Sequence, residues 1–115
     1  MPHAIIEYSD NLKTEFQSGR ISGSVHTVLT ESGLFKPQDI RTRAYETHDF
    51  LVGNKLQNGR FVHIIVYLME GRTVEQKRSL SQSIVDRLCP MLKNVDFISA
   101  DIRELATDVY CKAST

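Results

Sequence analysis

The chain has 115 residues, and its 14 lysines and arginines balance its 14 aspartates and glutamates, giving a formal net charge of +0. This balance argues against a nucleic-acid or membrane-surface binder, which would carry a basic excess. No apolar run reaches the length of a membrane span, and the N-terminus lacks the pattern of a secretion signal. We therefore expect a single cytoplasmic domain over residues 1–115.

The first predicted element is a short, isoleucine-rich buried strand over residues 3–8, closed by the turn-forming sequence Ser9-Asp10-Asn11. Pro2 directly precedes this strand. If the initiator methionine is removed, Pro2 carries a free secondary amine on the end of an apolar run. Burial disfavours the charged form of an amine, so this group could act as a base near pH 7. The alternative is that Pro2 belongs to a frayed chain start.

Residues 20–32 form the first predicted helix, because apolar side chains recur there at helical spacing: Ile21, Val25, Val28 and Leu29. Gly33 follows as a C-terminal cap. The segment 12–19 before this helix has a mixed pattern, which fits one helical turn and a loop.

A second strand is predicted from Ile40 to about Val52. Alternation along a strand places Arg41 and Arg43 on one face and Thr42 on the other. The simplest interpretation is a charged face exposed to water. The alternative is that one of the two arginines binds a carboxylate.

The third predicted strand, residues 61–69, is the most apolar stretch of the chain and follows the turn signal Asn58-Gly59. Both of its faces are apolar. One face carries Val62, Ile64, Val66 and Leu68, and the other carries Phe61, His63, Ile65, Tyr67 and Met69.

A second helix is predicted over residues 74–89, because Thr73 and Gln76 match a capping box and leucine and isoleucine follow at four-residue spacing. Arg72 lies just before its N-terminus. The simpler interpretation is a solvated arginine offset by Glu75. The alternative is an anion site, since an arginine beside free helix N–H groups suits a carboxylate.

The last predicted strand runs from Val95 to about Leu105, which completes the order β-α-β-β-α-β. Right-handed crossovers allow both helices to lie on one face of a four-stranded mixed sheet, so the fold class is α+β. The central strand is apolar on both faces, but the helices cover only one. We therefore expect the uncovered face to contact other copies of the chain.

Several segments together resemble 5-carboxymethyl-2-hydroxymuconate isomerase, a family of the tautomerase superfamily. The resemblance spans nearly the whole chain and is carried by Pro2-His3, the strand ending in Glu7, Ser9-Asp10-Asn11, Ile40-Arg41-Thr42-Arg43, Phe61-Val62-His63, Gly71-Arg72-Thr73 and Ile98-Ser99-Ala100-Asp101-Ile102-Arg103-Glu104-Leu105. Residues 46–58 and the tail after Leu105 carry no matching motif. One hypothesis is that these two segments line the mouth of the pocket.

The resemblance implies a homotrimer in which the mature N-terminal proline is both base and acid. On this sequence, Pro2 would move the proton, while Arg72 and Arg41 would bind the carboxylates of the substrate and stabilise the dienolate. The substrate would be a small dicarboxylate or tricarboxylate enol. No metal and no organic cofactor would be required, because the conjugation of the substrate spreads the charge.

Three functions follow from this interpretation. The main hypothesis is a cofactor-free isomerase in the breakdown of aromatic acids such as homoprotocatechuate. The second is a related enzyme that acts on another unsaturated 2-oxo acid. The third is a non-catalytic, trimeric ligand-binding protein with the same fold.

Overall fold

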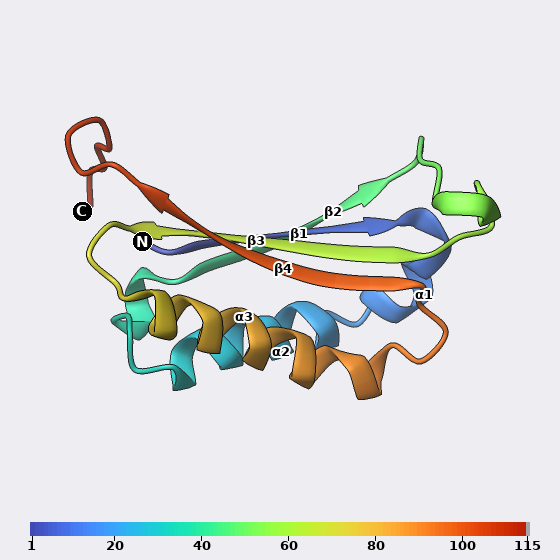
Figure 1. Ribbon diagram of the computed structural model, residues 1–115, viewed down its shortest axis with the longest axis horizontal. Coiled ribbons are helices and arrows are strands. Elements are labelled where there is room, and N and C mark those ends of the chain that lie inside the picture. The colour runs from blue at the N-terminus through green and yellow to red at the C-terminus, as the bar shows by residue number, and fades with distance from the viewer. Residues whose placement is uncertain (115) are drawn as a thin grey trace.

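The computed structural model describes residues 1–114, which form a curved sheet with helices against one of its faces (Figure 1). The elements in chain order are β1 (His3–Ser9), α1 (Lys13–Phe16), α2 (Arg20–Glu31), β2 (Arg41–Thr47), β3 (Phe61–Met69), α3 (Val74–Leu88) and β4 (Phe97–Leu105). Short 3-10 turns lie in the connections, including Pro37–Asp39 directly before β2. No helix among residues 1–114 is long and apolar enough to cross a membrane.

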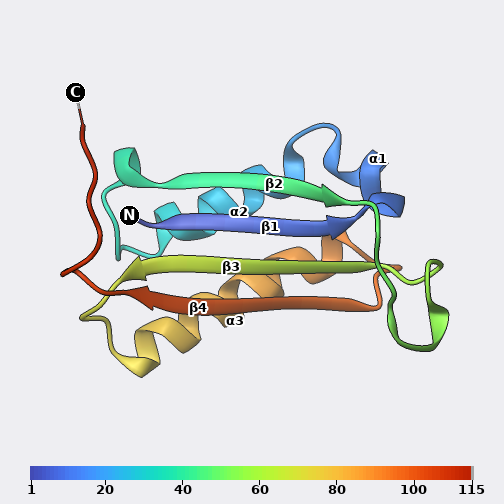
Figure 2. The same cartoon turned by 90° about the horizontal axis from the view of Figure 1, so that it is seen from above.

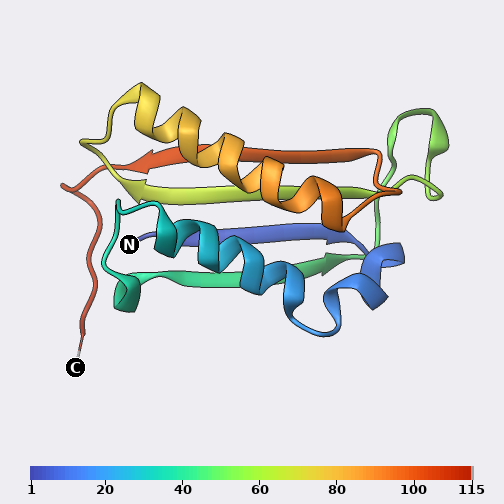
Figure 3. The same ribbon diagram turned by 90° about the horizontal axis from the view of Figure 1, so that it is seen from below.

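The sheet has the strand order β2-β1-β3-β4. β1 pairs with β2 and β3 pairs with β4 in parallel, whereas β1 and β3 are antiparallel. α2 connects the first parallel pair and α3 connects the second (Figure 3). The predicted β-α-β-β-α-β order and the mixed sheet are therefore confirmed.

The register of the sheet brings distant segments to one end. His3 lies opposite Arg41 on one side and opposite Tyr67 on the other, and Tyr67 lies opposite Arg103. The starts of β1 and β2 and the ends of β3 and β4 are thus side by side (Figure 2). We call this edge the Pro2 end of the sheet.

The core fills the layer between the sheet and the two long helices. The helices bury the side chains predicted from their spacing, namely Ile21, Val25, Val28, Leu29, Leu80, Ile84 and Leu88. The facing sheet residues are Ala4, Ile6, Val62, Ile64, Val66 and Leu68, each at most 1% exposed. Burial of about 25 cal/mol per Å² of apolar surface makes this layer the main source of stability.

Local signals define the ends of both long helices. The Thr73 hydroxyl accepts a hydrogen bond from the Gln76 N–H (3.1 Å), and the Gln76 side chain accepts one from the Thr73 N–H (2.9 Å). This is the predicted capping box at the start of α3. After α2, Gly33 adopts a φ of 74°, the left-handed conformation that glycine provides at a helix end.

The predicted extent of the second strand was wrong, because β2 ends at Thr47 rather than near Val52. Residues 48–60 instead form a loop with internal hydrogen bonds, such as that from the Val52 N–H to the Leu56 carbonyl (3.0 Å), and with hydrogen bonds to other segments, such as that from the Asn11 side chain to the Gly59 carbonyl (2.7 Å). Gly59 packs directly against Val52, and a Cβ atom on Gly59 would collide with the Val52 side chain. Val52 therefore contributes to the packing of its own loop and not to the strand.

Within residues 1–114, one face of the sheet has no helix over it (Figure 1). The residues of β3 that point to this face are all partly exposed: Phe61, His63, Ile65, Tyr67 and Met69. This agrees with the predicted division of β3 into two faces. The open face is therefore an apolar surface on the isolated chain.

Candidate active site at the Pro2 end of the sheet

Pro2 is buried directly before β1. Its side chain is less than 2% exposed. Its carbonyl accepts a hydrogen bond from the Arg41 N–H (3.1 Å), which extends the pairing of β1 with β2 by one residue. The alternative of a frayed chain start is therefore wrong. Burial and this hydrogen bond define the position of the Pro2 nitrogen relative to β2.

The surroundings of the chain start disfavour a protonated amine. In the chain that retains Met1, burial lowers the pKa of the α-amino group, and the positive charge of Lys112 lowers it further. Asp39 opposes this effect, and Arg41 adds to it. After removal of Met1 the free amine belongs to Pro2, which is more deeply buried, so we expect the same influences on its pKa.

Arg41 and Arg43 share one face of β2, as predicted, and this is the open face of the sheet. Arg43 contacts another side chain there. The Arg43 Nη1 atom lies 3.1 Å from the His3 Nδ1 atom. Burial, then Arg43, then Arg41 lower the pKa of His3, which favours the neutral ring that accepts this bond. Within residues 1–114 the Arg41 guanidinium has no ion-pair partner. Arg41 is thus the cation beside Pro2 that is available to an anion.

Thr42, on the opposite face of β2, contacts the helix layer. The His26 Nδ1 atom of α2 lies 2.8 Å from the Thr42 hydroxyl. This contact joins α2 to β2. It shows that Thr42 faces the helices, so Arg41 lies on the opposite face of the strand. The alternation predicted for this strand is therefore confirmed.

Arg72 is anchored rather than solvated. Its Nη2 atom donates a hydrogen bond to the Leu34 carbonyl (2.6 Å), and its guanidinium carbon lies 5.7 Å from the centre of the Phe35 ring. The interpretation of a solvated arginine offset by Glu75 is therefore wrong. Arg72 lies at the Pro2 end, but it points to the helix layer, whereas Arg41 points to the open face. The side chains of Pro2, Arg41 and Arg72 share an end of the fold and not a direct contact among the described residues.

Two further residues at this end had no signal in the sequence. The C-terminal tail brings Tyr110 close to His3, with 3.4 Å between the Tyr110 hydroxyl and the His3 Nε2 atom. It also brings Lys112 to Asp39, with 3.8 Å between the Lys112 Nζ and Asp39 Oδ1 atoms. The tail is polar and weakly patterned, so neither contact was predicted.

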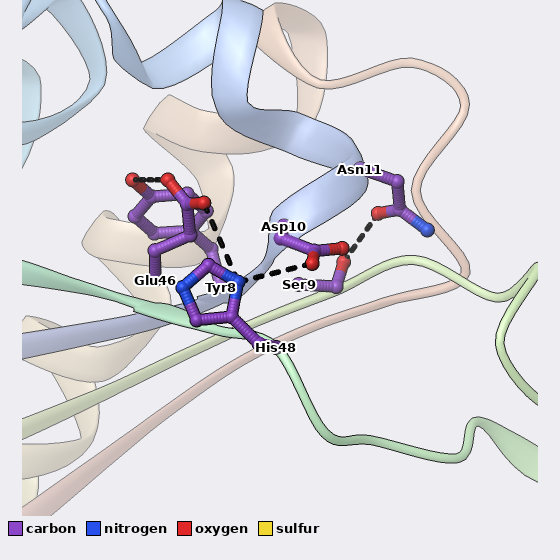
Figure 4. Close-up of polar contacts among 6 residues, drawn as sticks. All are labelled: Tyr8, Ser9, Asp10, Asn11, Glu46 and His48. Atoms are coloured by element: carbon purple, nitrogen blue, oxygen red, sulfur yellow. Dashed lines mark hydrogen bonds and ion pairs between the residues drawn. The ribbon is translucent and has the colours of Figure 1, made fainter.

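A second polar cluster lies at the opposite end of β1 (Figure 4). The Tyr8 hydroxyl donates a hydrogen bond to Glu46 (3.3 Å), and the His48 Nδ1 atom lies 3.1 Å from Asp10. Burial and then the charge of Glu46 raise the pKa of Tyr8. Asn11 donates to the Gly59 carbonyl (2.7 Å), which ties the end of β1 to the loop before β3. The cluster therefore connects strand ends far from Pro2.

Comparison with known proteins gives this site its context. The model of the 5-carboxymethyl-2-hydroxymuconate isomerase family matches residues 2–114, nearly the whole chain. The chain belongs to this family. It is accordingly an isomerase. The resemblance inferred from the sequence motifs is confirmed.

Individual relatives of this isomerase are distant in sequence and close in fold. A 5-carboxymethyl-2-hydroxymuconate Delta-isomerase of Escherichia coli is 24% identical over 75% of this chain and 68% of its own. The structure of a 5-carboxymethyl-2-hydroxymuconate isomerase from Deinococcus radiodurans R1 superposes with a TM-score of 0.83, at 23% identity, over 99% of this chain and 90% of that one. A fused 4-OT solved as a symmetric trimer gives a TM-score of 0.74 at 16% identity, over 97% and 92% of the two chains.

These similarities establish the tautomerase-like fold of the isomerase, a four-stranded mixed sheet with two long helices on one face. Within residues 1–114 no group of three or more histidine, cysteine, aspartate or glutamate residues is arranged to hold a metal ion.

Proposed function

We propose that this isomerase converts 5-carboxymethyl-2-hydroxymuconate into its 2-oxo-3-ene isomer, with the N-terminal proline as the proton carrier. The observation that carries the proposal is the position of Pro2. It is buried and hydrogen-bonded at an end of the sheet where burial and the charge of Lys112 lower the pKa of a terminal amine. A base that is neutral near pH 7 is what proton transfer from an enol requires.

In the proposed reaction, Pro2 accepts the proton of the enol hydroxyl group as the O–H bond breaks. The electron pair moves through the conjugated chain, and the protonated Pro2 then donates a proton to a chain carbon, where a C–H bond forms. The double bonds shift, and no net oxidation or reduction occurs. Arg41 and Arg72 bind carboxylates of the substrate and stabilise the negative dienolate formed between the two steps. The negative charge spreads over the conjugated substrate, so the mechanism calls for no metal or organic cofactor.

The two arginines suit different tasks. The Arg41 guanidinium is exposed and unpaired within residues 1–114, so it can bind a carboxylate without breaking an existing ion pair. The Arg72 guanidinium uses one of its five N–H donors on Leu34, which fixes its plane and leaves the others for the substrate. An arginine held in this way loses less side-chain entropy when it binds a carboxylate.

We also propose that the active form is a homotrimer. The open sheet face carries apolar side chains of β3, and no helix in the described part of the chain covers it. The fused 4-OT with the same fold is a symmetric trimer, and this supports the same assembly here. Light scattering at micromolar concentration should give three times the mass of the chain. A stable monomer under these conditions would contradict this part of the proposal.

The proposed role lies in the cytoplasmic breakdown of aromatic acids such as homoprotocatechuate. Two alternatives remain testable: an enzyme acting on another unsaturated 2-oxo acid, and a binding protein without activity. Protein shown by intact mass to begin at Pro2 should be mixed with a 2-hydroxymuconate while ultraviolet absorbance is followed. Rapid loss of enol absorbance supports a tautomerase, whereas binding without turnover supports a binding protein without activity.

The dependence of the rate on pH tests the proline mechanism itself. An α-amino group ordinarily has a pKa of about 7.7–8.0. Because burial and nearby cations favour the neutral amine, kcat/KM should rise with pH through one ionisation below that range. A rise at or above the ordinary value would contradict a desolvated proline base.

A further inference from the structure

The C-terminal tail, residues 106–114, runs from β4 across the Pro2 end of the sheet (Figures 2 and 3). It contacts the rest of the chain at three points along this path. Near β4, the Thr107 hydroxyl donates a hydrogen bond to Glu70 (2.8 Å). Beside β1, Tyr110 lies against His3, and next to β2 the tail brings Lys112 to Asp39. The tail therefore lies beside the candidate active site.

Lys112 has a partner that a ligand could replace. Its Nζ atom is 3.8 Å from the Asp39 carboxylate, which is long for a charge-assisted hydrogen bond, and the two side chains are 38% and 33% exposed. Exposed ion pairs contribute little to stability, because water screens both charges. The long, flexible lysine stem also allows the ammonium group to reach another anion. A carboxylate bound at this end could therefore recruit Lys112 at small cost.

Lys112 lies at the same end of the sheet as Pro2 and Arg41. Asp39 ends the 3-10 turn that leads into β2, two residues before Arg41, and Arg41 is hydrogen-bonded to Pro2. In the chain that retains Met1, burial lowers the pKa of the terminal amine most, and Lys112 is the charged group that lowers this pKa most. Lys112 and the unpaired Arg41 are thus two cations near one end of β1, which is the arrangement that a dicarboxylate would fit.

We propose that Lys112 is a specificity-determining residue, whose ammonium group leaves Asp39 and binds a further carboxylate of a substrate that carries two or three carboxylates. This inference rests on the proposed function for the location of the active site. It adds a cation from the tail, a segment without any family motif in the sequence. It also gives a physical reason for a preference for dicarboxylates over monocarboxylates.

The test uses binding, so that it does not depend on turnover. Titration calorimetry would compare cis,cis-muconate, a six-carbon dienedioate, with sorbate, the matched six-carbon monocarboxylate. The protein should begin at Pro2, as checked by intact mass. The variants are Lys112→Gln, which removes the charge, and Lys112→Arg, which keeps it. The control is Lys13→Gln, because Lys13 is exposed in α1 at the opposite end of the sheet (Figure 1).

We expect the unmodified protein and the Lys13→Gln control to bind muconate about tenfold more tightly than sorbate, since a charge-assisted contact supplies at least that factor. Lys112→Gln should reduce this preference severalfold by weakening muconate binding alone, and Lys112→Arg should keep most of it. If Lys112→Gln retains the full preference, or if the unmodified protein does not prefer muconate, the inference is wrong. Failure of the proposed isomerisation would instead show as absent turnover with the muconate preference intact.

Discussion

Replacement of Arg72 by alanine tests whether the contacts of Arg72 with Leu34 and Phe35 stabilise the fold. The substitution leaves the Leu34 carbonyl without its donor and removes the guanidinium from the Phe35 ring. A hydrogen bond to a charged group contributes about 1.5–3 kcal/mol, and the partial exposure of Arg72 favours the lower end. The contact with the ring adds about 0.5 kcal/mol at such a site. The free energy of unfolding should therefore fall by about 2 kcal/mol.

This change is large enough to measure by thermal unfolding. At about 2.1 cal/mol/K per residue, the unfolding entropy of a 115-residue chain is about 0.24 kcal/mol/K, so the midpoint should fall by about 8 °C. Samples must have equal protomer concentration, because an oligomer unfolds at a concentration-dependent temperature. The control is Arg78→Ala, on an exposed part of α3, which should change stability by less than about 0.5 kcal/mol. If the midpoints of the two variants fall equally, Arg72 is not an anchor.

Activity is measured separately, at a temperature where both variants remain folded. Loss of a charge-assisted contact with a substrate carboxylate should lower kcat/KM of Arg72→Ala at least tenfold. The Arg72→Lys variant keeps the positive charge but not the planar fork of donors, so it should recover only part of the activity. A variant that loses stability but keeps full kcat/KM would leave Arg72 as a purely structural residue.

Three other perturbations address Pro2, Arg41 and the loop before β3. Protein that retains Met1 should fold but isomerise almost no substrate, because the Pro2 nitrogen is then an amide without a basic lone pair. Intact mass and the isomerisation rate, measured on the same sample, test this prediction. Equal rates for the unprocessed and the processed protein would exclude Pro2 as the base. Arg41→Ala should lower kcat/KM at least tenfold. It should change the free energy of unfolding by less than about 0.5 kcal/mol, since the side chain is exposed. Unchanged kinetics would show that Arg41 is not part of the site. Gly59→Ala should destabilise the fold by about 1–3 kcal/mol in urea unfolding, because its Cβ would collide with the Val52 side chain; an unchanged midpoint would contradict this packing.

Local patterns in the sequence are enough to predict the elements, their order and the faces they bury. The spacing of Ile21 to Leu29 and of Leu80 to Leu88 predicted which sides of α2 and α3 enter the core. The capping box of Thr73 and Gln76 marked the start of α3. These features could be predicted because they depend on residues three or four positions apart in one helix.

The sequence also predicted the candidate residues Pro2, Arg41 and Arg72, but not their surroundings. Local alternation showed that Arg41 and Arg43 share a face, whereas only the register of β1 against β2 engages Arg43 with His3 and leaves Arg41 unpaired. The end of β2 at Thr47 was missed for a similar reason. It depends on the packing of the loop over residues 48–60 and not on a pattern within the strand.

The contacts that complete the Pro2 end arise only in the folded chain. Arg72 and Leu34 are separated by 38 residues, and His3 and Tyr110 by 107. No periodic pattern relates positions so far apart, because their distance is set by how the strands pair and how the tail crosses the sheet. A polar tail such as residues 106–114 has no apolar spacing to reveal its path. Its place beside Pro2 emerges only when folding brings Lys112 to the turn before β2.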